Sequence, residues 1–270
     1  MKVQIDCVSY NIQFDRSSTG LIPIVFLHGF MGSSKDWQFL TGKLNEEFNP
    51  IFIDLVGHGS TDSPGDKKHY TEDSIITSLK SIFDKLNLHE FIMAGYSMGG
   101  RAALCYSLKY PAQTKGLILE GANPGIKEKN ERKKRAKNDY QMSLMLENEQ
   151  LENFLQYWYS QAIFKSLKKS EIKKLILLRK TNNKFGLAKV LRNFSTGKMK
   201  NHWNELDNIK CKTLLIAGEF DKKYCEINKK ISGKIKSCQL EMIKKAGHNT
   251  HLENHFEYIS VVNNFLTNYF

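Results

Sequence analysis

The pentapeptide Gly95-Tyr96-Ser97-Met98-Gly99 constrains the fold of this chain more than any other stretch of its sequence. It follows an apolar run over residues 91–94 and precedes a helix-like segment over residues 101–108. This order predicts a strand, a sharp turn and a helix, which is the geometry of a nucleophile elbow with the G-x-S-x-G pattern. Glycines at both ends remove Cβ atoms that would collide in the turn, so the Ser97 hydroxyl can stand clear. The alternative is a chance Gly-Ser turn, and partners for Ser97 elsewhere in the chain argue against it.

Five further short apolar runs predict buried parallel strands, because helical patterns separate them. These runs cover residues 22–27, 51–55, 116–120, 213–217 and 239–243. The alternating start over residues 3–14 predicts an antiparallel hairpin at the edge of the sheet. We therefore expect an α/β fold, with a mostly parallel, doubly wound sheet and helices on both of its faces.

A long segment without a convincing strand separates the runs 116–120 and 213–217. We interpret residues 127–206 as a helical cap, inserted into a core domain that is formed by residues 1–126 and 207–270. In the cap, residues 140–159 carry apolar side chains near helical spacing, which favours core packing over a binding surface. These side chains are Leu144, Leu151, Leu155 and Trp158.

Length and composition suit one large core: 270 residues with 41% hydrophobic side chains can bury enough surface to shape a pocket. No signal peptide precedes the first alternating segment, and no apolar run approaches the roughly 20 residues of a membrane span. We therefore expect a cytoplasmic protein without membrane insertion. The five cysteines are odd in number and lack a C-x-x-C pair, so their spacing suggests neither a disulfide framework nor a zinc site.

The formal net charge of +12 fits nucleic acid, an acidic surface or an anionic small substrate as a partner. The densest cluster, residues 127–137, holds seven basic and two acidic side chains, a pattern that favours a solvated helix face. The sequence has no zinc-finger, RNA-recognition or helix-turn-helix signature, and no basic groove interleaved with aromatic residues. We expect no nucleic-acid partner, and the oligomeric state stays open.

Ser97 needs two partners, because a serine hydroxyl reacts only when a histidine takes its proton and a carboxylate fixes that histidine. His248 follows the last predicted strand, and Asp221 follows the strand before it. All three side chains come at carboxyl ends of strands, where open α/β sheets place their sites. We therefore predict a triad of Ser97, Asp221 and His248 that needs no metal or cofactor. The structural alternatives are a loop-capping role for His248 and a helix N-cap for Asp221.

Other residues compete for these roles. His251 is the nearest rival of His248, while Glu120 and Asp54 are competing acids because each also ends a predicted strand. We expect Asp54 to order its own glycine-rich turn instead.

Catalysis also needs donors aimed at developing negative charge, and removal of one such donor typically costs about 3 kcal/mol of transition-state stabilisation. The backbone amides of Met98, after the nucleophile, and of Phe30, in the loop after residues 22–27, are the predicted oxyanion hole. His28 in that loop is expected to be a structural residue and not a base.

With these features the chain resembles the α/β-hydrolase superfamily over its whole length, in which serine, acid and histidine follow in this order. More narrowly, it resembles the MenH family, the 2-succinyl-6-hydroxy-2,4-cyclohexadiene-1-carboxylate synthases of the menaquinone pathway. Several of the motifs that carry this resemblance lie in the cap, which general hydrolases share poorly. The motifs are residues 95–101, 119–125, 131–135, 158–161, 178–179 with 182–183, and 247–249.

The resemblance implies a carbon–oxygen lyase of menaquinone or phylloquinone biosynthesis. Such an enzyme eliminates pyruvate from 2-succinyl-5-enolpyruvyl-6-hydroxy-3-cyclohexene-1-carboxylate, with Ser97 and His248 acting as the base. Matching the motifs makes Arg101, Arg135 and Arg179 the arginines that bind a tricarboxylate substrate, and makes Tyr96 and Trp158 residues of the same pocket. Planar guanidinium forks suit carboxylates. The alternative is that Arg135 and Arg179 are ordinary surface residues of the cap.

The departures from the family pattern are small and remove no proposed catalytic group. Val56 stands where relatives commonly have proline, and Ala122-Asn123 replaces a frequent Gly-His pair. The same triad would also serve a serine esterase, a thioesterase or a C–C bond hydrolase, and a non-catalytic receptor could keep the fold. Dehalogenases and epoxide hydrolases resemble this fold with an aspartate where Ser97 stands, so this sequence disfavours them.

Overall fold

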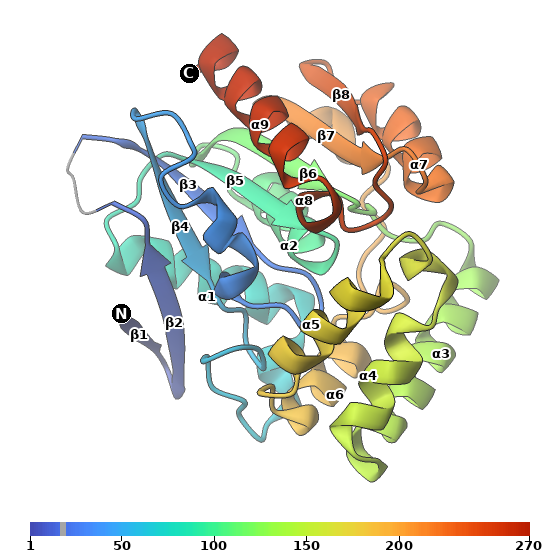
Figure 1. The fold of residues 1–270 in the computed structure, drawn as a ribbon. Coiled ribbons are helices and arrows are strands. Elements are labelled where there is room, and N and C mark those ends of the chain that lie inside the picture. The colour runs from blue at the N-terminus through green and yellow to red at the C-terminus, as the bar shows by residue number, and fades with distance from the viewer. Residues whose placement is uncertain (17–19) are drawn as a thin grey trace.

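The computed structural model describes residues 1–16 and 20–270, and these residues form an eight-stranded sheet in the order β1-β2-β4-β3-β5-β6-β7-β8 (Figure 1). The strands β1 and β2 are antiparallel at one edge, and the other six are mutually parallel. The expected fold class is therefore confirmed. The strands are β1 (Lys2–Ile5), β2 (Val8–Phe14), β3 (Ile22–Leu27), β4 (Phe48–Ile53), β5 (Phe91–Tyr96), β6 (Thr114–Glu120), β7 (Lys212–Gly218) and β8 (Cys238–Ile243).

The predicted strand over residues 51–55 differs most from the structure. Strand β4 begins at Phe48 and ends at Ile53, so Asp54 lies in the turn that follows it. Pro50 stands inside the strand, opposite Ile24 of β3. A proline cannot donate to a strand ladder and reads in a sequence as a break, which explains why the prediction started too late.

Helices cover both faces of the sheet, as expected. Successive residues of β3 point to opposite faces, because side chains alternate along a strand. Val25 and Leu27 pack with the helices α1, α2 and α7, while Ile24 and Phe26 pack with the 3-10 helix η1 and the helix α9. These elements are η1 (Ser34–Leu40), α1 (Glu72–Lys85), α2 (Met98–Lys109), α7 (Lys222–Ser232) and α9 (His255–Tyr269), with the short α8 (Thr250–Glu253) before α9.

Four α-helices lie between β6 and β7 and sit beyond the carboxyl ends of the central strands (Figure 1). They have an apolar cluster of their own, which includes Leu146, Phe154 and Leu187. The segment over residues 140–159 is divided between two helices, because Glu149 and Gln150 adopt extended backbone conformations. The four helices are α3 (Lys129–Asn148), α4 (Leu151–Tyr159), α5 (Lys169–Arg179) and α6 (Lys184–Asn193).

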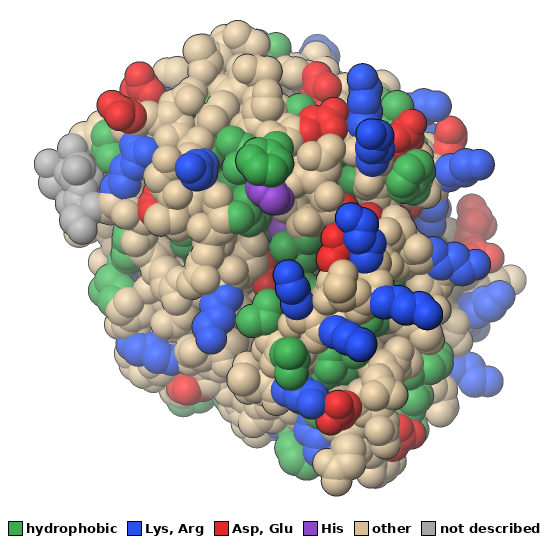
Figure 2. All heavy atoms as spheres, in the orientation of Figure 1, with side chains coloured by type: hydrophobic (Ala, Val, Ile, Leu, Met, Phe, Trp, Pro, Cys, Tyr) green, Lys and Arg blue, Asp and Glu red, His purple; other side chains and the backbone are tan. Residues whose placement is uncertain are grey.

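Lysines and arginines on the face in Figure 2 are scattered over the surface of these four helices and interspersed with acidic side chains. The lysines of the cluster at residues 127–137 are exposed, as a solvated helix face requires. All five cysteines are free thiols. In the described part of the chain, no helix combines the length and the apolar character that crossing a membrane requires.

Candidate active site

Ser97 occupies a strained turn between β5 and α2. Its backbone has φ 49° and ψ −102°, in the left-handed half of the map that few side chains adopt. A Cβ atom added to Gly95 would lie 2.5 Å from the Gly99 carbonyl carbon, so the turn requires glycine there. The Ser97 amide donates a 2.8 Å hydrogen bond to the Glu120 carbonyl, which fixes the turn to the neighbouring strand β6.

The three predicted triad residues lie in one hydrogen-bonded chain. His248 Nε2 is 3.2 Å from Ser97 Oγ, and His248 Nδ1 is 2.6 Å from Asp221 Oδ2. Because the Asp221 carboxylate can only accept a hydrogen bond, the ring proton of His248 lies on Nδ1, and Nε2 is free to accept the serine proton. Asp221 also caps α7, because its Oδ1 accepts a 3.3 Å hydrogen bond from the Tyr224 amide. The N-cap interpretation of Asp221 therefore holds together with the triad contact.

The nearest rivals of the triad residues pair with each other instead. Both oxygens of Glu120 lie within 2.9 Å of His251 Nδ1, and Thr250 Oγ1 donates a 2.6 Å hydrogen bond to the same carboxylate. Both side chains are fully buried. Glu120 and His251 thus form a closed structural pair, beside Tyr96, whose ring lies against both His248 and His251.

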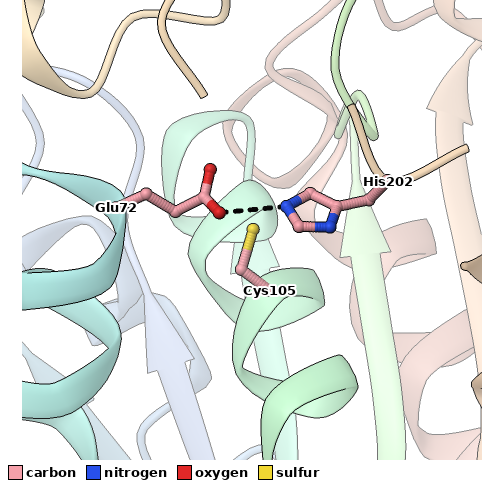
Figure 3. Close-up of side chains that lie close together, drawn as sticks. All are labelled: Glu72, Cys105 and His202. Carbon is pink, nitrogen blue, oxygen red and sulfur yellow. Dashed lines mark hydrogen bonds and ion pairs between the residues drawn. The ribbon is translucent and has the colours of Figure 1, made fainter. Parts of the chain in front are cut away.

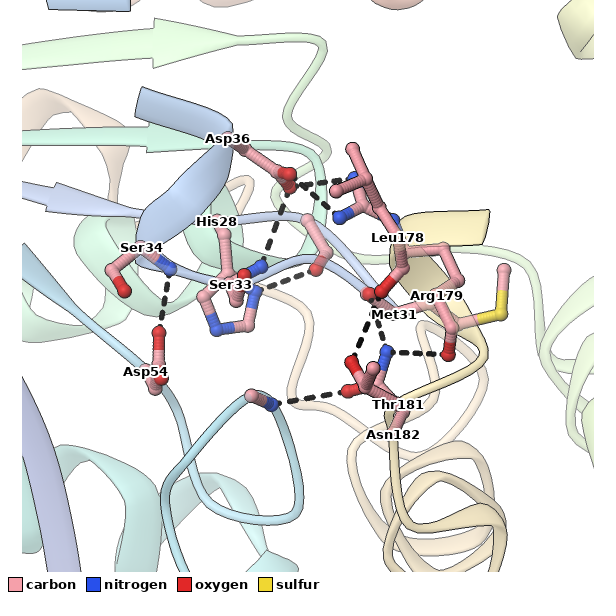
Figure 4. A network of polar contacts seen from close by, with 12 residues as sticks. His28, Met31, Ser33, Ser34, Asp36, Asp54, Leu178, Arg179, Thr181 and Asn182 are labelled. Carbon is pink, nitrogen blue, oxygen red and sulfur yellow. Dashed lines mark hydrogen bonds and ion pairs between the residues drawn. The ribbon is translucent and has the colours of Figure 1, made fainter. Parts of the chain in front are cut away.

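Asp54 and His28 hold loops, as the sequence indicates. Asp54 accepts a 2.5 Å hydrogen bond from the Ser34 amide (Figure 4) and a 2.8 Å hydrogen bond from the Ser60 amide. His28 Nε2 accepts from the Leu55 amide at 3.0 Å, so its other nitrogen donates to the Gly29 carbonyl at 2.7 Å. Burial lowers the pKa of His28, so the ring stays neutral. Since both ring nitrogens are already hydrogen-bonded to the backbone, His28 is not available as a base.

Both residues of the predicted oxyanion hole lie at the site. Phe30 and Met98 line the same cavity as Ser97 and His248. Met98 is the first residue of α2, where backbone N–H groups have no partner in a preceding helical turn. Among the described residues, neither amide donates a hydrogen bond to a backbone carbonyl in a turn or loop. The positive end of α2 therefore faces the space next to Ser97.

This cavity has a volume of about 220 Å³ and lies between the sheet and the helices α3–α6. All five residues expected to bind substrate line it, together with Ser97 and His248. The cavity is thus apolar on its aromatic walls and charged at a few points, which is typical of a small-molecule site. The five residues are Tyr96, Arg101, Arg135, Trp158 and Arg179.

Arg179 does not present a free fork to the cavity. Its terminal nitrogens Nη1 and Nη2 donate hydrogen bonds of 2.6 and 2.8 Å to the two oxygens of Asp36, which lies in η1 (Figure 4). Both side chains are about 6% exposed. Burial alone would lower the pKa of Arg179, but the attraction of the Asp36 carboxylate is stronger than this effect, and the pKa of Arg179 is raised. Each terminal nitrogen keeps one further N–H, and the Nε–H is buried without a hydrogen-bond partner within the described residues.

Arg135 also has an acidic partner. Its Nε donates to both oxygens of Asp139, one turn further along α3, at 2.9 and 2.8 Å. The Asp139 side chain is fully buried, whereas that of Arg135 is 40% exposed. The hydrogen bonds of Arg135 to other described residues involve Nε alone, so its terminal nitrogens face the cavity and solvent.

Arg101 is the arginine whose charge is least compensated. It lies one turn beyond Ser97 on α2, and it has no acidic partner among the ion pairs of the described residues. Its Nη1 donates a 2.8 Å hydrogen bond to the Phe194 carbonyl, and its guanidinium lies 4.6 Å from the centre of the Phe194 ring. Burial lowers the pKa of Arg101 to about 10, which still leaves the side chain charged at neutral pH.

The structure thus adds an acidic partner to two of the three arginines that were expected to bind the substrate. Sequence reasoning missed the two acidic partners because a buried arginine needs a counterion that the motifs do not name. Asp139 could have been found, since it stands four residues after Arg135 on a predicted helix. Asp36 carries no such signal, because 143 residues separate it from Arg179. The cavity walls also include Tyr159, which lies in the motif at residues 158–161, and Tyr224, which no pattern in the sequence pointed to.

No group of potential metal ligands among the described residues lies at this cavity. The cluster with suitable geometry, Glu72, Cys105 and His202, lies outside its walls. The cavity can therefore support proton transfer by a histidine-activated serine, with amides and arginines to bind negative charge.

Comparisons with known proteins agree with this geometry. A family profile described as "alpha/beta hydrolase fold" matches residues 22–255. A Bacillus subtilis (strain 168) protein, provisionally named 2-succinyl-6-hydroxy-2,4-cyclohexadiene-1-carboxylate synthase, is 37% identical over 90% of both chains. The synthase of the same name from Enterobacter sp. (strain 638) is 32% identical over 86% of both.

Solved structures extend this similarity to three dimensions. The structure of MenH from S. aureus has a TM-score of 0.89 and 33% identity, and covers 96% of this chain and 98% of its own. The enol-lactonase from Burkholderia xenovorans LB400 has a TM-score of 0.84 at 16% identity, which shows a shared fold alone.

Proposed function

Because the chain belongs to the alpha/beta hydrolase fold family and, within it, to the 2-succinyl-6-hydroxy-2,4-cyclohexadiene-1-carboxylate synthases, we propose that it catalyses the reaction of that name. In this reaction pyruvate is eliminated from 2-succinyl-5-enolpyruvyl-6-hydroxy-3-cyclohexene-1-carboxylate during menaquinone or phylloquinone biosynthesis. The protein is then a carbon–oxygen lyase on a hydrolase scaffold.

One observation carries this proposal: the cavity that contains Ser97 and His248 is also lined by Arg101, Arg135 and Arg179. A substrate with three carboxylates needs several cationic donors next to the reacting carbon, whereas a neutral ester needs none. The three arginines come from α2, α3 and α5, so they can reach a small anion from different sides.

In the proposed mechanism Ser97 acts as a base and not as an acylated nucleophile. Its proton moves to His248 Nε2, and Ser97 Oγ removes a proton from a carbon of the substrate. The carbon–oxygen bond to the enolpyruvyl group then breaks, and the leaving group takes up a proton and departs as pyruvate. Proton removal next to a carbonyl builds an oxyanion, and in this mechanism the Phe30 and Met98 amides stabilise it.

The arginines carry a net charge of about +1 in this cavity, because Asp36 and Asp139 offset two of the three guanidinium groups. The donors left for substrate carboxylates are the terminal nitrogens of Arg135 and the N–H groups of Arg179 and Arg101 that do not already bond Asp36 or the Phe194 carbonyl. We infer that Arg101 provides the main charge compensation and that Arg135 and Arg179 mainly orient the substrate. Tyr96 and Trp158 supply apolar walls.

We also propose that residues 127–206 act as a cap over a core domain of residues 1–126 and 207–270. The helices α3–α6 lie within this range, and the cavity has walls from both parts. Both ends of the segment meet, because the His202 amide donates a 2.8 Å hydrogen bond to the Pro124 carbonyl.

Pyruvate release tests the proposed function. The substrate is generated in situ by the preceding enzyme of the pathway, and the rate above spontaneous decay is measured for the wild type, Ser97→Ala and Ser107→Ala. Ser107 is the matched control, because it lies on the same helix and only bonds the Ala103 carbonyl. We expect Ser97→Ala to lose about 100-fold or more in kcat and Ser107→Ala to lose little. Background rates in the wild type, or normal rates in Ser97→Ala, would reject the proposal.

A serine esterase, thioesterase or C–C bond hydrolase is the second candidate, because the hydrogen-bonded triad is as complete as acyl transfer requires. Turnover of p-nitrophenyl esters that is lost in Ser97→Ala, without pyruvate release, would favour this candidate.

A further inference from the structure

Glu72, Cys105 and His202 meet in a largely buried cluster beside α2, outside the walls of the cavity (Figure 3). Glu72 begins α1, Cys105 lies in α2, and His202 belongs to the connection from α6 to β7. Glu72 Oε1 is 3.0 Å from His202 Nε2, and one potential ligand atom of each residue lies within 4.8 Å of the other two. In Figure 3 the sulfur of Cys105 points toward the space between the carboxylate and the imidazole.

Further hydrogen bonds fix the orientation of two of these side chains. His202 Nδ1, the nitrogen that points away from the cluster, is 3.1 Å from Glu205 Oε1. The second oxygen of Glu72 accepts a 2.9 Å hydrogen bond from the Lys200 amide. A histidine that binds a metal almost always donates its other N–H to a carboxylate or carbonyl, which sets the tautomer that the metal needs. The pair of His202 and Glu205 has this arrangement.

The cluster is separate from the active site. Cys105 lies two helical turns after Ser97, a rise of about 12 Å along α2. None of the three residues lines the cavity of the triad. The proposed elimination of pyruvate therefore gives these side chains no role.

We propose that Glu72, Cys105 and His202 form a zinc site. Zinc prefers thiolate, imidazole and carboxylate ligands at 2.0–2.3 Å in a tetrahedron, which places the ligand atoms about 3.3–3.8 Å apart. The cluster already approaches this spacing, so only small side-chain movements are needed to bring the three atoms around one ion. Solvent water is the fourth ligand, since Glu72 Oε2 is held by Lys200 and Glu205 is held by His202.

Binding requires that the thiol of Cys105 release its proton to solvent and that His202 bind the ion as neutral imidazole. Burial raises the pKa of the Cys105 thiol, so without an ion the sulfur is a protonated thiol. The thiolate forms only with the ion, whose double positive charge replaces the lost proton.

Zinc at this position would join three parts of the chain that are distant in sequence. It would connect the first turn of α1, the middle of the elbow helix α2 and the segment that returns from the cap to β7. Because a preformed site is absent from the unfolded chain, zinc binding would stabilise the folded state. A structural role is therefore expected, without a direct effect on the chemistry at Ser97.

The test uses the full chain, stripped of metal with a chelator and titrated with Co²⁺ and then Zn²⁺. Cobalt bound to a thiolate absorbs in the near ultraviolet, so the wild type should show this band at one equivalent and lose it when zinc is added. The midpoint temperature of thermal unfolding should rise by about 5 °C or more when the free zinc concentration is about a hundred times the dissociation constant. Absence of the thiolate band at saturating cobalt would overturn the proposal, whatever the variants show.

Matched variants assign the ligands. Cys105→Ser and Glu72→Gln should lose the thiolate band or the stoichiometric binding, while Glu205→Gln should keep the band and bind about 10- to 100-fold more weakly. Cys211→Ser and His89→Gln are the controls, since Cys211 lies outside the cluster and His89 is exposed. Loss of the band in Cys211→Ser with retention in Cys105→Ser would also overturn the proposal. Circular dichroism of each variant separates loss of binding from loss of folding.

Discussion

Arg179 and Asp36 form a two-pronged ion pair between the helix α5 and the 3-10 helix η1 of the core (Figure 4). Two hydrogen bonds of 2.6 and 2.8 Å join the guanidinium to the carboxylate, and the pair is almost fully buried. An arginine that was expected to bind the substrate is thus also a structural contact. Substitutions at this pair must therefore separate stability from catalysis.

We predict that Asp36→Ala destabilises the protein by about 3–5 kcal/mol, because it leaves the buried guanidinium of Arg179 without a counterion. The double variant Asp36→Leu/Arg179→Met should recover a large part of this loss, since no charge then remains buried. Urea unfolding at neutral pH measures both changes. Equal stabilities of Asp36→Ala and the double variant would show that the charges are not coupled.

The control for this prediction is an exposed ion pair between Lys180, which follows Arg179 in the chain, and Glu152 of α4. Lys180 and Glu152 lie 2.9 Å apart, with side chains 38% and 51% exposed. Glu152→Ala should change the unfolding free energy by no more than about 1 kcal/mol, because solvent screens such pairs. The contrast with Asp36→Ala isolates the effect of burial.

Arg101→Ala should raise KM by about 10- to 100-fold, because a charge-assisted hydrogen bond contributes about 1.5–3 kcal/mol. The physical reason is that Arg101 alone brings an uncompensated charge to the cavity. Steady-state pyruvate release over a range of substrate concentrations gives KM and kcat separately. Lys109→Ala removes an exposed charge from the end of the same helix and should leave KM unchanged. An unchanged KM in Arg101→Ala would assign charge compensation to the other two arginines.

His248→Asn and His251→Asn should have opposite effects. We expect His248→Asn to lower kcat by about 100- to 10,000-fold with little change in melting temperature, since it removes the group that takes the serine proton. His251→Asn should keep most of kcat but melt at a lower temperature, because Glu120 loses its buried partner. Pyruvate release and thermal unfolding of both variants provide the test. A large loss of kcat in His251→Asn, in a folded protein, would contradict the proposed division of roles.

Acid should destabilise the fold through His28 and His58. Burial lowers the pKa of both imidazoles below the ordinary value of 6.5, and the nearby His28 adds to the effect at His58. Below about pH 6.5 these two histidines bind protons in the unfolded chain but stay neutral in the folded protein. The folded state therefore loses stability relative to the unfolded state as the pH falls below this value. The limiting slope is about 1.4 kcal/mol per pH unit for each group.

Urea unfolding between pH 5 and 7 measures this dependence. His58→Asn should flatten the slope, whereas His89→Asn, at an exposed position, should leave it unchanged. His202 acts in the opposite direction, because hydrogen bonding to Glu72, against the effect of burial, raises its pKa. The stability that His202 contributes is present at low pH and is lost as the pH rises through its pKa in the folded state. For this reason the slopes of the variants are compared with one another, and the wild-type slope alone is not used.

The sequence determined the parts of this protein that local pattern dictates. Apolar runs with turn signals specified six parallel strands, and glycines at both ends of Tyr96-Ser97-Met98 specified the elbow, because the backbone of Ser97 needs that space. The order of strands then put Ser97, Asp221 and His248 at one edge of the sheet, since parallel strands end on the same side. The family resemblance added the expectation that Arg101, Arg135 and Arg179 bind the substrate.

Only the tertiary structure decided how charges and rival side chains are paired. His251 and Glu120 resemble catalytic residues in the sequence, but in the structure their side chains are buried and pair with each other, not with Ser97. Asp36 reaches Arg179 across 143 residues, and Glu72, Cys105 and His202 converge from three separate segments. The physical reason is that a buried charge or polar group must find a partner in space, and the packing of the sheet and the helices above it, not distance along the chain, determines which partner is near.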